Sequence, residues 1–396
     1  MNEQRKPLAY DPILLGCVLA LVCLGLVMVY SASAITAHEK LGDSFFFLKR
    51  QAIAAGLGFV AMAAAMKLGY RRVARLAWPF LLLALVLLVA VLIPGVGSAA
   101  GGARRWIRLP GVSLQPAEIA KIAWVVYLSY SLAKKREKMR TFSIGFLPHL
   151  GLAGILVLLC MAEPDFGSSV ALLVMMFVLL FAAGAKLSWL VGSVLLGIPF
   201  AWTAIAHSPY RAKRLAAFWD PWADRKGSGY QVVESLMSIG SGGWTGLGLG
   251  DGRQKLFFLP EAHTDFIFAI IGEELGLLGV AVVVGLFGVI IWRGVRAALR
   301  SPEPFGTYLA LGITALFAFQ AIINMGVAMG LLPTKGLTLP FISYGGSSLI
   351  TLMGAAGLLL SVSGSGEGAQ RRVVKPARRV APAPMPVTGG ASEAPA

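Results

Sequence analysis

Apolar stretches of about 20 residues alternate with short polar connections along most of the chain. Stretches of this length cross a bilayer as α-helices, and none shows the period-two alternation of a membrane β-barrel strand. The pattern predicts an all-α integral membrane protein, a polytopic bundle of about ten transmembrane helices. The predicted spans cover roughly residues 12–33, 48–67, 76–95, 116–133, 146–163, 165–184, 187–206, 265–292, 306–330 and 343–363.

One polar segment is much longer than the others. Residues 207–264 lie between the seventh and eighth predicted spans and contain FWDPWADRKGSGYQ followed by a glycine-rich run. The chain therefore divides into a short N-terminus (1–11), a membrane domain (12–363) that includes this large extracytoplasmic loop, and a tail (364–396). Because the tail is rich in Ala, Pro and Gly and carries two Arg pairs, it is predicted to be disordered and basic.

Composition agrees with a membrane protein. The chain is 57% hydrophobic and only 14% charged, whereas about a quarter of the residues of a soluble domain are charged. The net charge is +16, but the basic residues occupy short loops and termini, where membrane topology requires them, so we expect contact with membrane lipid and not with nucleic acid. The three cysteines lie inside apolar runs, which excludes a disulfide framework and a cysteine metal site.

The distribution of Lys and Arg predicts the orientation. Ten spans place both termini on one side, and the basic clusters at residues 67–75, 134–140 and 293–300 fall on that same side. The positive-inside rule identifies this face as cytoplasmic. Arg104, Arg105 and Arg108 violate the rule, because their short loop lies outside, and cations held there need an anionic partner.

With this topology, the informative polar side chains gather on the outer face: Lys49, Arg50, Arg104, Arg105, Glu118, Lys121, Asp165, Lys335 and Ser343. A site at the outer leaflet is the simplest explanation. Glu118 and Lys121 are three residues apart on a predicted helix and so share a face. Charges inside a span either pair to order the bundle or contact substrate, and the sequence leaves both interpretations open.

Two aspartates begin predicted spans. Asp165 follows a proline, and a helix N-cap explains it better than catalysis does. Asp265 comes two residues after His263 at an apolar boundary, where a raised pKa would make its carboxylate a proton acceptor near neutral pH. A helix N-cap formed by Thr264 or Asp265 explains the same pattern equally well.

Two further glutamates, Glu273 and Glu274, lie about two turns deeper in the eighth predicted span. They are either buried partners of the outer cations or charges that pack helices together, and both interpretations stay open. The four histidines have no metal-ligand spacing, and no nucleophile–base arrangement is visible.

Several segments, taken together and in order, resemble the SEDS family (shape, elongation, division and sporulation). They are GLVMVYSASA, FFFLKRQ, RRWIRLPGVSLQPAEIAK, EPDFGSS, GSGYQVVESLMSIGSGGWTGLGLGDG, LPEAHTDFIFAIIGEELG and LPTKGLTLPFISYGGSS. The likeness covers about residues 10–363, and the last two segments look more like the division members than the elongation members. Phe257 and Glu163 depart from residues that are common in the family, an acidic residue and a glutamine respectively.

The resemblance implies peptidoglycan glycosyltransfer, in which lipid II is polymerised at the outer leaflet of the bacterial cytoplasmic (inner) membrane, here at the division septum. It implies that Asp265 is the catalytic aspartate, acting as general base, and that Glu118 and Lys121 are the functionally important intramembrane pair. It also implies a class B penicillin-binding transpeptidase as partner, together with other membrane proteins of the division machinery.

A polyprenyl pyrophosphate leaving group requires cations. If the resemblance holds, Arg50, Arg105, Lys121, Arg211, Arg214 and Lys335 are candidates for this task, and Gln231, Glu261, His263 and Ser343 are further candidates for substrate binding. A divalent ion, Mg²⁺ or Mn²⁺, could share the task, but the sequence assigns no metal ligands.

Two other functions remain as alternatives. A flippase for a lipid-linked precursor would need essential polar groups that reach both faces, whereas here they favour the outer one. A non-catalytic division scaffold would tolerate the loss of Asp265 and Lys121.

Overall fold

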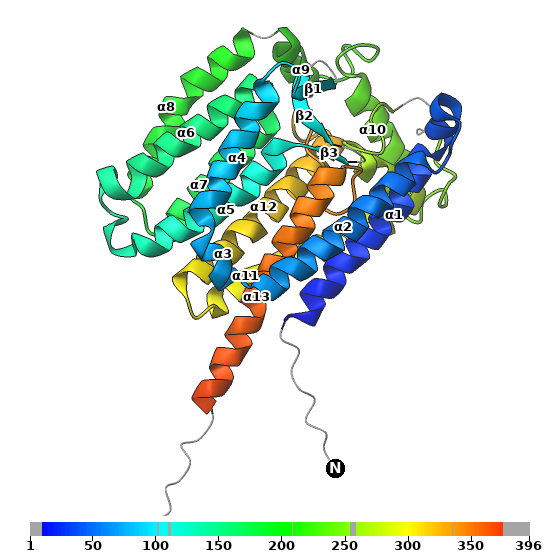
Figure 1. Cartoon of the computed structure of the whole chain (residues 1–396). Coiled ribbons are helices and arrows are strands. Elements are labelled where there is room, and N and C mark those ends of the chain that lie inside the picture. The colour runs from blue at the N-terminus through cyan, green and yellow to red at the C-terminus, as the bar shows by residue number, and fades with distance from the viewer. Residues whose placement is uncertain are drawn as a thin grey trace, which may run out of the picture.

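The computed structural model describes residues 10–100, 103–109, 112–207, 209–253, 259–334 and 336–374. Long helices run side by side in a bundle, with a small sheet and two short helices at one end and the start of α1 at the other end (Figure 1). The first half contains α1 (Pro12–Leu41), α2 (Phe46–Leu68), α3 (Tyr70–Arg75), α4 (Ala77–Leu92), β1 (Gly97–Ala100), β2 (Ala103–Leu109), β3 (Val112–Leu114), α5 (Pro116–Lys134), the 3₁₀ turn η1 (Arg136–Lys138) and the π-helical turn η2 (Phe142–Phe146).

The second half is also helical. It contains α6 (Leu147–Ala162), α7 (Phe166–Ala182), α8 (Leu187–Ala206), α9 (Pro209–Trp219), α10 (Tyr230–Ser241), α11 (Ile267–Arg300), α12 (Pro304–Ala328) and α13 (Gly346–Val374).

Six helical segments of the described chain are long and apolar enough to cross a membrane: Pro12–Leu41, Phe46–Leu68, Phe142–Ala162, Ile267–Arg300, Pro304–Ala328 and Gly346–Ser365. The other four predicted spans fold as the helices α4, α5, α7 and α8, which are shorter or carry charges. The all-α membrane class is therefore confirmed, while the number of spans stays a prediction.

Three parts of the structure differ from the expected boundaries. Residues 97–114 form an antiparallel sheet of order β1-β2-β3, with Ser98 opposite Trp106 and Ile107 opposite Leu114, where the sequence suggested a loop. The segment 207–264 is not all loop, because α9 and α10 lie within it. α13 continues to Val374 and so passes the predicted end of the membrane domain.

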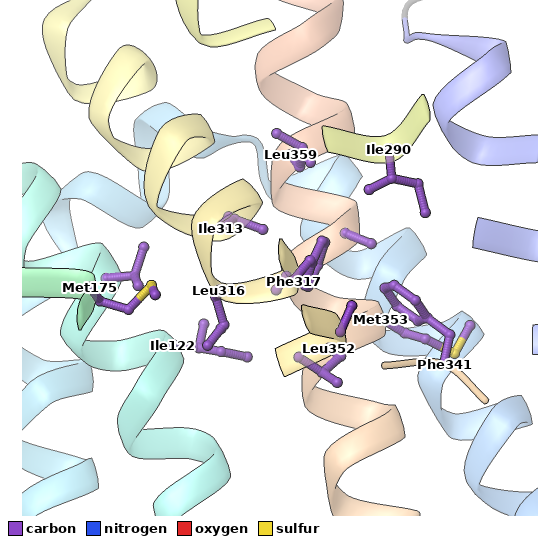
Figure 2. Packing of buried hydrophobic residues seen from close by; sticks show 14 of the residues in the cluster. Ile122, Met175, Ile290, Ile313, Leu316, Phe317, Phe341, Leu352, Met353 and Leu359 are labelled. Atoms are coloured by element: carbon purple, nitrogen blue, oxygen red, sulfur yellow. The ribbon is translucent and has the colours of Figure 1, made fainter. Parts of the chain in front are cut away.

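α12 is the central helix of the bundle. Figure 2 shows Leu316 and Phe317 of α12 among apolar side chains from α5, α7, α11 and α13. Both side chains are fully buried. Because α12 contacts these four helices, its polar residues near the sheet end reach the interior of the bundle.

α11 has a sharp break. Gly276 has φ 63° and ψ −163°, which is not helical, so the helix changes course there. A Cβ at Gly276 would lie 2.3 Å from the backbone nitrogen of Gly246, so only glycine fits. The first part of α11 therefore packs closely against the glycine-rich run that follows α10.

Candidate functional site

Asp265 lies in the turn before α11. The N-cap position of α11 is Phe266, which makes no side-chain capping bond, so the prediction of a cap by Thr264 or Asp265 is wrong. Instead, the turn is organised by Glu261, whose φ of 56° reverses the chain. The carbonyl oxygen of Glu261 accepts from the backbone N–H of Thr264 at 3.1 Å and of Asp265 at 3.2 Å. The carboxylate of Asp265 is thereby left available for other chemistry.

Two buried side chains from distant segments hold the backbone of this turn. The Asn324 amide of α12 donates to the carbonyl oxygen of Asp265 at 2.9 Å and to that of Leu337 at 2.7 Å. The Ser343 hydroxyl donates to the carbonyl oxygen of Thr264 at 2.7 Å. The segment that precedes α13 is thus joined to the Asp265 turn. Ser343, predicted to bind substrate, holds this backbone, and Asn324 is a site residue that the sequence did not reveal.

The surroundings of Asp265 raise the pKa of its carboxyl. Burial, and then the negative charge of Glu261, raise this pKa to about 7 against the opposing effects of Arg214 and Arg105. Among the described residues, no group donates a hydrogen bond to the carboxylate. A group with a pKa near neutral pH is suited to accept a proton during catalysis.

Arg105 is placed by the sheet. Its Nε donates to the carbonyl oxygen of Glu163 at 2.9 Å, and a terminal nitrogen of the guanidinium donates to the carbonyl oxygen of Pro164. β2 thus carries this arginine across to the turn between α6 and α7. Because the charge of Arg105 lowers the pKa of Asp265, the two side chains face the same region.

Arg214 reaches the site from α9. One terminal nitrogen of its guanidinium donates to the carbonyl oxygen of Thr334 at 3.1 Å, and its charge also lowers the pKa of Asp265. A Cβ at Gly336 would lie 3.2 Å from Oδ2 of Asp265, so the backbone of this segment passes beside the carboxylate. Two predicted cations therefore lie near Asp265.

Arg50 and His263 pack against aromatic side chains at one side of the site. The His263 ring packs against both Phe47 and Tyr344, with centroid distances of 4.6 Å and 5.4 Å, and these two rings also contact each other. Arg50 lies over the Phe46 ring, 4.4 Å from its centroid, and its positive charge acts to lower the pKa of Tyr344 against the effect of burial. Burial lowers the pKa of His263, so its neutral form is favoured at neutral pH.

Glu118 and Lys121 form a buried salt bridge. Nζ of Lys121 lies 2.8 Å from Oε1 of Glu118, and both side chains are almost fully buried. The other carboxylate oxygen, Oε2, has no hydrogen-bond partner among the described residues. The pairing interpretation is therefore confirmed, and the unpartnered oxygen leaves a direct role for Glu118 open.

The turn between α6 and α7 contains two buried carboxyl groups, those of Glu163 and Asp165. Asp165 caps α7, since it accepts from the backbone N–H of Ser168 at 3.0 Å, which confirms the predicted N-cap. Glu163 is buried, and neither of its carboxylate oxygens has a partner in the described structure. Burial, and then the charge of Asp165, raise the pKa of Glu163 to about 8, against the effect of Arg105. The sequence analysis named Glu163 only as a departure from the family and not as a site residue. Its position, an acidic residue at the junction of two predicted spans, was the feature that could have indicated a role.

Glu273 and Glu274 hold the glycine-rich run. Glu273 accepts from Ser238 at 3.1 Å and from the backbone N–H of Arg253 at 2.6 Å. Glu274 accepts from Ser31 at 2.7 Å and from the backbone N–H of Gly250 at 3.2 Å. Of the two interpretations, these contacts favour packing of the loop against α1 and α11.

Two predicted site residues fall outside the described part of the chain, and a third is not linked to this group by a described contact. The side chain of Arg211 and the whole of Lys335 lie outside the described residues, as does Phe257. Gln231 is on the first turn of α10, and in the part of the chain that the structure describes no hydrogen bond links it to Asp265.

A metal site formed by protein side chains alone is not seen. The described residues contain no group of three or more His, Cys, Asp or Glu side chains that could hold an ion. Mg²⁺ commonly binds through one or two carboxylates together with substrate phosphates. Asp265 and Glu261 could supply these one or two carboxylates. A divalent ion bound jointly by the protein and a pyrophosphate therefore stays a prediction.

Comparison with known proteins shows which family the sequence is similar to. The model of a family described as "Cell cycle protein", that of FtsW, RodA and SpoVE, matches residues 12–367. A protein of Geobacter metallireducens named probable peptidoglycan glycosyltransferase FtsW is 51% identical over 354 residues, covering 89% of this chain and 94% of that protein. Stage V sporulation protein E of Bacillus subtilis is 43% identical over 358 residues, covering 90% and 98%.

Solved structures give the same result for the fold. A chain from a study of polymerization and crosslinking by a peptidoglycan synthase complex has a TM-score of 0.75 at 33% identity and covers 91% of this chain and 99% of its own length. The rod shape determining protein RodA of Thermus thermophilus has a TM-score of 0.67 at 31% identity, covering 90% and 97%. The similarity thus spans nearly the full length of each compared protein.

Proposed function

Because the chain belongs to the SEDS family of FtsW, RodA and SpoVE proteins, we propose that it is a peptidoglycan glycosyltransferase that polymerises lipid II during septal cell-wall synthesis. The observation that carries the proposal is the turn at Asp265. It places a carboxyl with a pKa of about 7 in the electrostatic range of Arg105 and Arg214. A proton acceptor beside cations is the arrangement that glycosyl transfer from a pyrophosphate needs.

The carboxylate of Asp265 acts as general base. The acceptor sugar hydroxyl attacks the anomeric carbon of the donor, and its proton passes to Asp265 as the new carbon–oxygen bond forms. The bond between the anomeric carbon and the pyrophosphate oxygen breaks, and the pyrophosphate takes the electron pair. A pKa of about 7 leaves a large share of Asp265 ionised at neutral pH, as a base requires.

Arg105 and Arg214 stabilise the charge that develops on the polyprenyl pyrophosphate. Arg50 belongs to the same end of the bundle and serves the same substrate. Arg211 and Lys335 are proposed for this task from the sequence alone. Gln231, Glu261 and His263 are proposed as further substrate contacts.

The buried pair of Glu118 and Lys121 lies on the first turns of α5, directly after β3 of the sheet that carries Arg105. We assign it to the floor of the site, where the ammonium of Lys121 adds positive potential below the pyrophosphate. The unpartnered oxygen of Glu118 supports a polar contact there.

The orientation follows from the same proposal. The Asp265 face is extracytoplasmic and both termini are cytoplasmic, in the bacterial cytoplasmic membrane. The membrane domain then runs from residue 12 to residue 363, with 207–264 outside. A class B penicillin-binding transpeptidase is the proposed partner. The similar chain from a peptidoglycan synthase complex supports this assignment.

The decisive experiment is polymerisation by the Asp265→Asn variant. The purified protein, with its transpeptidase partner, is given lipid II in detergent, and glycan strands are separated by electrophoresis. We expect a loss of activity of at least about 100-fold, the usual contribution of a general base. Because burial disfavours the ionised form, Asp265 destabilises the folded state increasingly as the pH rises from its ordinary pKa of 3.8 to about 7, so the variant should be at least as heat-stable as the parent at neutral pH.

The matched control is Asp251→Asn, which removes an exposed carboxylate from the same extracytoplasmic segment. It should polymerise at the parental rate. Normal activity of Asp265→Asn would sink the catalytic assignment. Movement of lipid II across vesicles by a protein that forms no glycan would favour a flippase instead.

A further inference from the structure

A cavity lies at the opposite end of the bundle from Asp265. α5 starts beside the sheet and has 19 residues, so its far end is about 28 Å away. Around that end, where α5 gives way to η1 and meets α4 (Figure 1), the surface encloses a cavity of about 710 Å³. Its volume is in the range of small-molecule sites, and the proposed glycosyl transfer does not use it.

The cavity is strongly basic. Lys134, Lys135, Arg136 and Lys138 line it, and Glu137 is the one acidic side chain among its lining residues. No carboxylate of the described residues forms an ion pair with any of these four cations. Four cations facing one hollow repel each other, so an anionic ligand there lowers the free energy.

One wall of the cavity is aromatic. Trp78 of α4 and Tyr127 of α5 meet edge to face with ring centroids 4.8 Å apart, and Tyr130 adds a third ring. Trp78 is 57% exposed although it sits on an apolar helix. Trp and Tyr in membrane proteins gather at headgroup depth, where one side of the ring is apolar and the other is wet.

Ser131, which lines the cavity, belongs to a buried group that packs behind it. Nε2 of His149 lies 2.9 Å from the Ser131 hydroxyl, and Nδ1 lies 2.6 Å from the carbonyl oxygen of Gly145. A Cβ at Gly145 would lie 2.6 Å from the carbonyl oxygen of Met139, so the basic turn packs directly on η2. The cations are therefore held around the hollow by packed backbone.

We propose that this cavity binds the phosphate-bearing headgroup of an anionic phospholipid from the leaflet at the terminus-bearing face. The cations bind the phosphate, and the aromatic wall contacts the glycerol region and the start of the acyl chains. Basic pockets beside membrane helices are sites of this kind. A soluble phosphate would not need the exposed indole of Trp78, and an acidic protein segment would not need a wall that faces lipid.

The test is lipid retention by the full-length purified protein, measured by native mass spectrometry with phosphatidylglycerol and with phosphatidylethanolamine. The cavity variant removes four charges: Lys134→Gln, Lys135→Gln, Arg136→Gln and Lys138→Gln. The control variant removes four charges from the same face outside the cavity: Lys67→Gln, Arg72→Gln, Arg75→Gln and Arg300→Gln. Trp78→Ala leaves all charges and removes the most exposed ring of the aromatic wall.

The parent and the control should retain phosphatidylglycerol in preference to phosphatidylethanolamine. Each lost cation should weaken binding about fivefold, so the cavity variant should bind at least about 100-fold more weakly. Trp78→Ala should weaken binding of the lipid but not of glycerol phosphate. If the cavity variant does not fold, the Trp78→Ala result decides alone.

Three results would overturn the proposal. The first is that the cavity variant retains as much phosphatidylglycerol as the parent does. If the cavity variant does not fold, equal retention by Trp78→Ala and the parent counts instead. The second is displacement of the lipid by glycerol phosphate at matched concentration, which would assign the cavity to soluble phosphates. The third is unchanged lipid retention combined with loss of the transpeptidase partner from the cavity variant, which would assign the cavity to an acidic protein segment.

Discussion

At the residue scale, the protonation of Asp265 is set by its burial and by three charged neighbours. Burial and Glu261 raise the pKa, while Arg214 and Arg105 lower it. The balance places the pKa at about 7, so a small change in any neighbour changes the fraction of active base. The neighbours thus set the pH at which the enzyme works.

The pH–rate profile of polymerisation should show this directly. A base must be ionised, so the rate should rise with pH through about 7. Glu261→Gln removes a negative charge that raises the pKa of Asp265, so the rising limb should move to lower pH. Glu39→Gln, which removes an exposed carboxylate on α1, is the control and should leave the profile in place. An unshifted limb in Glu261→Gln would contradict the electrostatic account.

The buried pair of Glu118 and Lys121 allows its two roles to be separated. Glu118→Gln leaves a buried ammonium unpaired and should lower the free energy of unfolding by about 3 kcal/mol. The double variant Glu118→Gln, Lys121→Met removes both charges and should recover most of that stability. If the pair also serves the substrate, the recovered protein should remain inactive in glycan synthesis. Recovery of both heat stability and activity would show that the pair only orders the bundle.

At the element scale, close packing of α2 against α13 depends on glycine. A Cβ at Gly357 would lie 2.3 Å from the carbonyl oxygen of Met62, and one at Gly58 would lie 2.4 Å from the sulfur of Met353. Small residues let membrane helices approach until their backbones touch. Because α13 follows the segment that holds Asp265, the spacing of these two helices affects the site.

Gly357→Ala should therefore separate α2 and α13. Overpacking of this kind lowers the free energy of unfolding by about 1–3 kcal/mol, and the melting temperature measured in detergent should fall. Gly354→Ala, one turn away on α13, meets only Ala61 at 3.8 Å and serves as the control. It should be neutral or slightly stabilising, since alanine favours helix by about 1 kcal/mol. Equal melting temperatures for the two variants would contradict the packing argument.

At the scale of the whole molecule, the two ends of the bundle have different chemistry. One end brings a carboxylate and cations together through the sheet, α9 and the turn before α11. The other end has the basic cavity, the start of α1 and the end of α13. The proposed enzyme thus works at one surface of the bilayer and is anchored to charged lipid at the other.

The sequence predicted what depends on local pattern. Apolar runs gave the helices, and the proline before Asp165 indicated a cap that the structure contains. It could not predict contacts between distant segments. Asn324 holds Asp265 across 59 residues, and Ser343 holds Thr264 across 79. The sheet at residues 97–114 was missed because its strands are short, with three to seven residues each, and β1 consists of Gly, Ser and Ala, which do not mark a strand.

The attachment of Arg105 to the turn between α6 and α7 has a consequence for substrate binding. Two of the five guanidinium N–H groups are already engaged with the carbonyl oxygens of Glu163 and Pro164. An arginine side chain carries about 2 kcal/mol of rotamer entropy, and here most of it is lost on folding. In the proposed reaction, the pyrophosphate would therefore meet a cation that is already oriented and has three donors left, and ordering that side chain would not reduce its affinity.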